Sequence, residues 1–343
     1  MKNKITNVEL FAGCGGLALG LEYAGFHHVA LNEFNRNACS TLKLNRPDWN
    51  IIHKDIKKVQ WNTFKNIDLL SGGFPCQAFS HSGKRLGLED TRGTLFYEFA
   101  RAITEISPLS FLAENVKGLI SHDNGNTLKT IITTFSQLGY HVFPYIVLNA
   151  NLYEVAQKRE RIFIFGVKKE YKEYFNFVKP TECKSLILKD VLQPSIYYPD
   201  PILETQGFKY SIIKKSYFEK IPPGGYWKDL QVEEQKQYLG KMFNSGGGKT
   251  GILRRLSMNE ACVTLLTSPS QKQTERCHPD EVRPFNIREY ARIQSFPDIW
   301  KFSGSISAQY KQIGNAVPVN LAKHVGQMIF RQIVEFKKNN QLN

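Results

Sequence analysis

The chain has 343 residues, of which 42% are hydrophobic and 22% charged, a composition typical of a folded protein of about two domains. No apolar run is long enough to cross a bilayer, and the basic start soon meets Glu9 and a glycine cluster, which argues against a signal peptide and indicates a cytoplasmic protein. The formal charge of +14 favours a polyanionic partner. Six scattered cysteines without a CxxC pair exclude a disulfide framework and a zinc site, so we expect no metal.

The first half of the chain alternates short apolar runs with segments of helical length. This alternation predicts βαβ units and a parallel sheet, which binds ligands at the carboxyl ends of its strands. The expected strands are 8–11, 29–33, 68–72, 110–115, 142–148 and 161–167, and the expected helices are 35–44, 94–106 and 125–138.

The pattern changes after Lys168. Residues 170–285 contain PPGG and GGG segments and many Tyr, Lys and Gln, without clear alternation, which predicts a second, loop-rich domain. A last amphipathic stretch, 319–336, predicts a terminal helix that folds back on the first domain.

A glycine-rich segment follows the first expected strand. Gly13, Gly15 and Ala18 fit the G-x-G-x-x-A pattern between a strand and a helix, where small residues allow a tight turn close to a ligand. Glu33 lies about 20 positions on, where an acidic residue holds ribose hydroxyls, and Asp55 could serve the adenine side. These residues indicate a nucleoside-containing cofactor but do not separate NAD from S-adenosylmethionine.

A second glycine cluster, GGGKT at 246–250, resembles the end of a phosphate-binding loop. That pattern needs a glycine at the position of Phe243, so we do not expect this chemistry.

Reactive side chains are expected at the ends of two further strands. Cys76 lies in the glycine-flanked loop after 68–72, and Glu114 ends the strand 110–115. Arg159 and Arg161 precede the strand 161–167, where alternation places both on one face. Each has a plainer interpretation, as a small buried thiol or as solvated charges. Arginines close to Cys76 would also favour its thiolate.

Taken in order, these segments resemble the motifs of the bacterial DNA (cytosine-5)-methyltransferase family of restriction-modification systems. PCQ, ENV and QxRxR in this order are highly specific. Glu9 replaces the family's usual Asp, and His53 and Lys54 precede Asp55 where a Gly is common, but no required group is lost. The matching segments are FAGCGG (11–16), FPCQ (74–77), TRGTLF (91–96), ENV (114–116), QKRER (157–161), REYARIQSFPD (288–298) and QIGNAVP (312–318), which cover most of the chain outside 170–285.

The resemblance implies transfer of a methyl group from S-adenosylmethionine to carbon 5 of a cytosine flipped out of duplex DNA. Cys76 would be the nucleophile that adds to carbon 6, which makes carbon 5 reactive toward the methyl group. Glu114 would bond the base around its ring N3 and amino group. Arg159 and Arg161 would hold the base and its phosphate.

The resemblance also implies the fold and the cofactor pocket. We expect a Rossmann-like methyltransferase sheet in a catalytic domain of residues 1–175 plus 306–343, with a smaller target-recognition domain and hinge at 176–305. Loop 77–94 would be a lid that closes over DNA. The residues expected to line the cofactor pocket are Phe11, Gly13, Cys14, Gly16, Glu33, Asp55, Ile56, Pro75, Leu95 and Asn315.

The expected partner is double-stranded DNA, read from the major groove by polar side chains such as those of 254–255 and 271–276. We expect a monomer without membrane contact, and a cognate restriction endonuclease as a functional rather than physical partner. Alternatives are an amino-group DNA methyltransferase, disfavoured because the only PP lies in IPPGG, a tRNA-modifying relative, a non-enzymatic DNA-binding protein and an NAD oxidoreductase.

Overall fold

The computed structural model describes residues 4–75, 95–202, 206–246, 249–271 and 274–341, which form two compact units. Unit 1 comprises residues 1–153, 160–182 and 317–343, and unit 2 comprises residues 154–159 and 183–316. Within the described ranges, no helix has both the length and the apolar character needed to cross a membrane.

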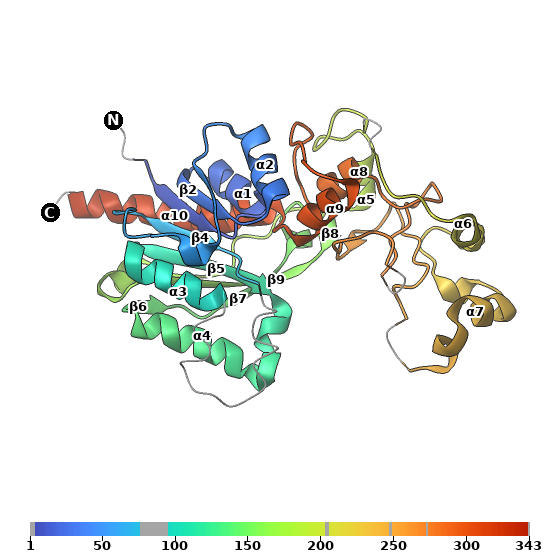
Figure 1. The fold of residues 1–343 in the computed structure, drawn as a ribbon, viewed down its shortest axis with the longest axis horizontal. Coiled ribbons are helices and arrows are strands. Elements are labelled where there is room, and N and C mark those ends of the chain that lie inside the picture. Colours follow the sequence, from blue (N-terminus) through green and yellow to red (C-terminus); the bar gives the residue numbers. More distant parts are fainter. Residues whose placement is uncertain (1–3, 76–94, 203–205, 247–248, 272–273, 342–343) are drawn as a thin grey trace. The chain divides into compact units, whose positions relative to one another are not determined.

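Unit 1 is an α/β unit built on one mixed sheet (Figure 1). Its strands are β1 (Thr6–Leu10), β2 (His27–Glu33), β3 (Ile51–His53), β4 (Leu69–Gly72), β5 (Ser110–Val116), β6 (Tyr140–Val142), β7 (Ile146–Asn149) and β9 (Glu160–Lys168). Its α-helices are α1 (Gly16–Ala24), α2 (Arg36–Asn45), α3 (Leu95–Ile106), α4 (Asn126–Gln137) and α10 (Val319–Gln341).

The strand order β3-β2-β1-β4-β5-β9-β6 creates a ligand-binding position at the centre of the sheet. The chain leaves β1 for β2 and β3 on one side, then returns to β4 and β5 on the other. A reversal of this kind opens a crevice at the carboxyl ends of the two central strands. The segments that follow β1 and β4 are the glycine loop and the segment leading to Cys76.

The expectation of a parallel sheet is correct for the five strands from β3 to β5 and wrong for the rest. β9 runs antiparallel to β5, and β6 and β7 both pair antiparallel with β9. The single strand predicted at 142–148 is divided because Pro144 cannot donate a backbone hydrogen bond. The other predicted strands and helices of the first half are confirmed, with ends shifted by a few residues.

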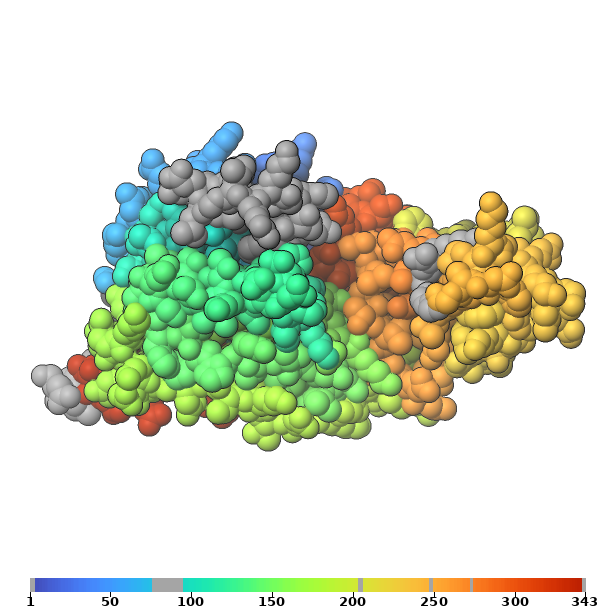
Figure 2. Space-filling model, turned by 90° about the horizontal axis from the view of Figure 1, so that it is seen from below, coloured from blue at the N-terminus to red at the C-terminus, as the bar shows by residue number. Residues whose placement is uncertain are grey.

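Helices cover both faces of the sheet, as right-handed crossovers on the two sides of β1 and β4 require (Figure 1). Helices α3 and α4 pack on one face through an aromatic core that includes Phe96, Phe99, Phe111 and Phe135. Figure 2 shows this layer from outside, with α4 at the surface of the unit.

The predicted terminal helix is confirmed as α10, which packs against α1 on the opposite face. Small residues bring the two helices close together. A Cβ at Gly20 would lie 2.4 Å from the Cβ of Ala322, and one at Gly326 would lie 2.9 Å from the Cβ of Ala24. The carboxyl-terminal segment is therefore part of the sheet unit.

Unit 2 contains little regular structure, as predicted for a loop-rich domain. It contains α5 (Leu188–Leu192), α6 (Ile212–Glu219), α7 (Val232–Leu239), α8 (Ile287–Ile293), α9 (Ile306–Asn315) and the short parallel pair β8 (Gln157–Lys158) and β10 (Cys262–Val263).

A buried carboxylate lies in the small core under α6 and α7. Glu275 has no exposed side-chain surface and lies 2.6 Å from Nζ of Lys214. It also accepts hydrogen bonds from the backbone N–H of Leu253 and the hydroxyl of Tyr238. Burial raises the pKa of Glu275 despite these partners. Three separate segments therefore depend on one carboxylate.

The limits of the units differ from the expected division at 175 and 306. Residues 154–159 belong to unit 2 because β8 pairs with β10. Residues 306–316, which include the whole of α9, also belong to unit 2, where Tyr310 donates to the backbone oxygen of Phe285.

Candidate active site

The glycine loop after β1 has a backbone that only small residues adopt easily. Gly13 and Gly15 have φ values of 55° and 90°, and Phe11 also has a positive φ of 57°. A Cβ at Gly13 would meet no atom within 4 Å, so the loop borders open space. Cys14 and Gly16 are buried beneath it. The loop thus offers room and exposed backbone on the side where a ligand would approach.

An acidic side chain from β2 lies against this loop. The Glu33 carboxylate accepts hydrogen bonds from the backbone N–H groups of Gly13 at 2.8 Å and Asn35 at 2.6 Å. Glu33 therefore fixes the loop and presents its carboxylate beside the open space. This arrangement fits the expected contact with ribose hydroxyls.

The next two candidates, Asp55 and Ile56, follow β3. Asp55 caps a short 3₁₀ helix (Ile56–Lys58) by accepting from the backbone N–H of Lys57 at 3.0 Å, and Ile56 is buried. Leu95, the first residue of α3, is half-buried.

Phe34, which the sequence reasoning missed, is 71% exposed and directly follows Glu33. An exposed aromatic ring beside a carboxylate that is expected to hold a sugar is suited to stacking on a base. Its adjacency to Glu33 in the sequence was the available signal.

The segment that leads to Cys76 is held by the end of β5. Asn115 donates from Nδ2 to the backbone oxygen of Phe74 at 2.9 Å, and both residues are buried. A Cβ at Gly73 would lie 2.7 Å from Oε2 of Glu114, so a larger residue there would displace the carboxylate. The carboxylate of Glu114 therefore lies against the backbone three residues before Cys76. Pro75 is exposed, whereas Cys76 and the expected lid, 77–94, lie outside the described residues.

Glu114 and Arg161 form a buried ion pair at the end of the sheet. Nε of Arg161 lies 2.9 Å from Oε1 of Glu114, and their side chains are 11% and 9% exposed. Burial lowers the pKa of Arg161, while Glu114 acts in the opposite direction. Nη1 of Arg161 also donates to the backbone oxygen of Glu160. The guanidinium thus sets the orientation of one carboxylate oxygen in a largely buried site.

Arg159 has different surroundings from those of Arg161. It belongs to unit 2, is 2% exposed, and donates to the backbone oxygens of Leu265 and Gly314. The sequence predicted that both arginines share one face. Arg159 instead lies between β8 and β9, where the chain passes from one unit to the other.

The arginines expected to read bases are largely engaged inside unit 2. Arg255 donates to the backbone oxygens of Ile221 and Pro279, both at 2.9 Å. Arg276 is buried and donates to the backbone oxygen of Glu275. Arg254 is half-buried, with its guanidinium 5.9 Å from the ring centroid of Tyr226. Base reading by Arg255 or Arg276 would break these contacts.

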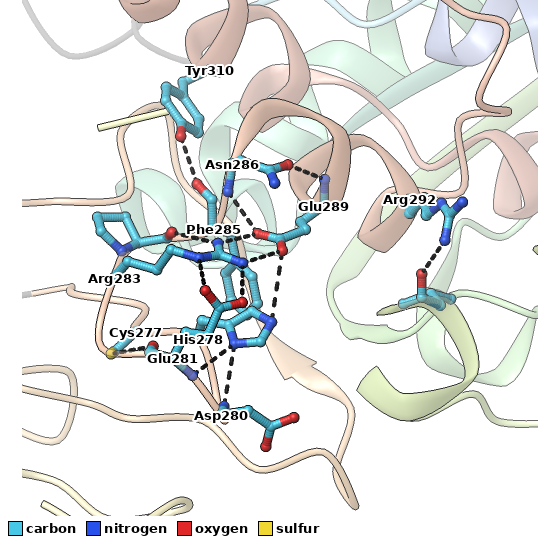
Figure 3. Close-up of polar contacts among 12 residues, drawn as sticks. Cys277, His278, Asp280, Glu281, Arg283, Phe285, Asn286, Glu289, Arg292 and Tyr310 are labelled. Carbon is cyan, nitrogen blue, oxygen red and sulfur yellow. Dashed lines mark hydrogen bonds and ion pairs between the residues drawn. The ribbon is translucent and has the colours of Figure 1, made fainter. Parts of the chain in front are cut away.

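Residues 277–289 form a polar network within unit 2, and Arg292 forms a separate ion pair with Asp298 (Figure 3). Glu289 on α8 accepts from Arg283 and from the backbone N–H of Asn286. Nδ1 of His278 accepts from the backbone N–H groups of Asp280 and Glu281, and its Nε2 lies 3.7 Å from Oε1 of Glu289. No cluster of three or more metal-ligating side chains occurs among the residues that the structure describes. Part of this network lines a cavity of about 560 Å³.

Comparison with known proteins identifies a family over nearly the whole chain. The family model for C-5 cytosine-specific DNA methylase matches residues 5–331. Type II methyltransferase M.Eco47II of Escherichia coli is 52% identical over 338 residues, which cover 98% of this chain and 81% of that protein. Type II methyltransferase M.Sau96I of Staphylococcus aureus is 51% identical over 344 residues, covering 98% and 78%.

Solved structures of similar fold share less sequence. A mutant of Spodoptera frugiperda DNMT2 has a TM-score of 0.65 at 16% identity, covering 95% of this chain and 99% of that chain. The Entamoeba histolytica methyltransferase EhMeth has a TM-score of 0.62 at 15% identity, covering 96% and 99%. These likenesses support the fold.

Proposed function

We propose that this chain, which belongs to the C-5 cytosine-specific DNA methylase family, transfers a methyl group from S-adenosylmethionine to a flipped-out cytosine in a short specific duplex sequence. The observation that carries the proposal is the buried pair of Glu114 and Arg161 against the backbone of Gly73, three residues before Cys76. An acidic group and a cation thus lie beside the backbone that leads to Cys76.

Cys76 is the proposed nucleophile, whose thiolate adds to carbon 6 of cytosine. The chemistry of the other cysteines supports this assignment, because a buried thiol gives little thiolate. Burial raises the pKa of Cys39, Cys262 and Cys277 to about 12 and raises that of Cys14 still further. Cys183 is exposed and lies in unit 2, outside the motifs of the family resemblance.

Glu114 is the proposed partner of the cytosine ring N3 and amino group as the thiolate adds. Arg161 restrains one oxygen of this carboxylate, which leaves the group oriented for a base in the site. A dry and restrained hydrogen-bonding group is worth more in the transition state than a solvated one. Arg159 is also a proposed site residue.

The glycine loop and strand ends of unit 1 fit a nucleoside cofactor, with open space beside Gly13 and the Glu33 carboxylate facing it. When bound, S-adenosylmethionine would supply an electrophilic methyl group. Glu33 would hold the ribose, and Asp55 and Phe34 the adenine side. The remaining proposed cofactor contacts are Phe11, Gly13, Cys14, Gly16, Ile56, Pro75, Leu95 and Asn315.

Unit 2 is the proposed target-recognition domain. The relatives of the whole chain are named type II methyltransferases. These names support duplex DNA as the substrate and protection from a cognate restriction endonuclease as the role. A DNA substrate also supports a location in the cytoplasm. We propose that the enzyme acts as a monomer.

The test is transfer of labelled methyl groups to duplex DNA and, separately, to tRNA. We expect label in DNA, and label in tRNA alone would overturn the proposed substrate. Cys76→Ser should abolish transfer while S-adenosylmethionine still binds. Normal turnover by this variant would reject the covalent mechanism. Bisulfite sequencing of methylated DNA would then identify the recognition sequence.

A further inference from the structure

Arg159 bridges two backbone segments that are far apart in the sequence. Its Nη1 donates to the backbone oxygen of Leu265 at 3.0 Å, and its Nη2 donates to that of Gly314 at 2.8 Å. Leu265 follows β10, and Gly314 lies in the last turn of α9. All of these groups belong to unit 2.

The two carbonyl groups need a side-chain donor for physical reasons. The last four carbonyls of an α-helix have no partner within the helix, and a buried carbonyl without a hydrogen bond costs about 1–3 kcal/mol. A cation at a helix C-terminus also opposes the negative end of the helix dipole. The planar guanidinium of Arg159 meets both needs, since it donates in two directions at once.

A second side chain fixes the same turn from another direction. Gln294 at the end of α8 donates to the backbone oxygens of Ile313 at 2.8 Å and Ala316 at 3.3 Å. Its own oxygen accepts from Gln157, whose oxygen in turn accepts from the backbone N–H of Leu265. Gln157 and Gln294 have no exposed surface. The network therefore closes on the two segments that Arg159 bridges.

The packing at Gly314 leaves no room for adjustment. A Cβ there would lie 2.1 Å from the backbone oxygen of Leu266. The backbone is held on both sides of Asn315, while the side chain of Asn315 is exposed. An exposed polar group on a fixed backbone is suited to binding a ligand without a loss of conformational entropy.

We propose that Arg159 is a positioning residue, whose two carbonyl contacts fix the turn that presents Asn315 to S-adenosylmethionine and the segment 264–266 that leads to the recognition residues. This inference rests on the proposed function, in which Asn315 contacts the cofactor. It replaces a direct contact of Arg159 with the base or its phosphate. One side chain thus sets cofactor affinity and DNA affinity together.

Binding of S-adenosylmethionine without DNA separates the two roles. A residue that contacts only the base would leave this affinity unchanged, whereas a positioning residue would not. We expect Arg159→Met to weaken the affinity about tenfold, which equals about 1.4 kcal/mol, the size of one hydrogen bond from a charged group. Isothermal titration with S-adenosylmethionine and a fluorescence assay with cognate duplex DNA would measure the two affinities.

The matched control is Arg288→Met. Arg288 also belongs to unit 2 and donates to two backbone oxygens, those of Pro297 and Trp300, which lie outside the bridged segments. We expect this variant to change the affinity less than about twofold, well below the effect of one charged hydrogen bond.

Two further variants keep the inference testable if Arg159→Met does not fold. Arg159→Lys preserves the charge but cannot span both carbonyls, so its affinity should be intermediate. Gln294→Met leaves Arg159 intact and removes the other support of the turn, so it should also weaken cofactor binding. Unchanged cofactor affinity in these variants, with slow single-turnover methylation, would assign Arg159 to the base and overturn the inference. Failure of the unmodified protein to bind S-adenosylmethionine would instead reject the proposed function.

Discussion

Arg161 in unit 1 and three arginines of unit 2 differ in their principal partners. In unit 1 the sheet pairs most backbone groups, and Arg161 meets a carboxylate, Glu114, at the end of a strand. In unit 2, which has little regular structure, Arg159, Arg255 and Arg288 donate to backbone oxygens. Buried carbonyls need donors, and where strands do not supply them, side chains do.

This contrast limits what the charge of +14 implies about DNA binding. Arginines that hold the backbone of unit 2 together are not available to phosphates or bases. Exposed lysines, and the half-buried Arg254, are better candidates for contact with DNA.

The largest effect should come from the ion pair of unit 1. Glu114→Gln keeps the shape and an oxygen that accepts from Arg161 but removes the charge and the acid. We expect single-turnover methylation at saturating DNA and cofactor to slow by about 10²–10⁴, the usual contribution of a general acid or base. The control is Glu160→Gln. Glu160 directly precedes Arg161, but its exposed carboxylate pairs with Lys117. A rate within threefold of the unmodified enzyme for Glu114→Gln would remove Glu114 from the mechanism.

The next effect tests whether unit 2 unfolds independently of the sheet. Glu275→Gln leaves Lys214 without its buried partner, which should cost about 3–5 kcal/mol of stability in unit 2. We expect urea unfolding to separate into two transitions, with DNA binding lost first. The control is Glu219→Gln, which alters an exposed carboxylate on α6, the helix that carries Lys214. A single unshifted transition would contradict the role given to Glu275.

Glu9, a buried residue of β1 that accepts from Ser71 on β4, should make the stability of the sheet depend on pH. Burial raises its pKa from 4.5 to about 8, with Ser71 as a hydrogen-bonding partner. Between these values the folded chain keeps a proton that the unfolded chain releases, so stability falls as pH rises through this window and levels off above it.

Glu9→Gln removes this proton exchange. The variant should match the unmodified protein near the lower pH limit and gain stability toward the upper one, on the order of a few kcal/mol since each unit is worth about 1.36 kcal/mol. Melting temperatures measured across the window would check it. Glu260→Gln, at an exposed position, should give a difference that does not vary with pH. Parallel pH profiles for Glu9→Gln and the unmodified protein would contradict the prediction.

The smallest effect should come from the exposed ion pair that flanks the buried one. Lys117 and Glu160 are about half exposed, with their charged atoms 2.9 Å apart. Lys117→Ala should change stability by less than about 1 kcal/mol, as exposed pairs contribute little. A large loss of stability or activity in thermal and kinetic assays would contradict the prediction, because the exposed pair would then contribute as much as the buried pair of Glu114 and Arg161.

The sequence by itself determined much of unit 1. Strands with helix-length separations, the spacing of Gly13, Gly15 and Glu33, and the position of Glu114 at a strand end all follow from local pattern. The glycine loop could be predicted because positive φ angles and close approach restrict the residue type. The antiparallel course of β9 could not, since strand direction depends on pairing with β5 from a distant part of the chain.

The hydrogen-bonding partners of Arg159, Arg161 and Asn115 could be determined only from the tertiary structure. Arg159 and Arg161 are two residues apart and look equivalent in the sequence, yet one meets carbonyls of residues 265 and 314 and the other a carboxylate. Asn115, which holds the backbone of Phe74, gave no signal beyond its motif. A hydrogen bond is defined by both partners, and when these lie 41 or 155 residues apart only the folded chain brings them together.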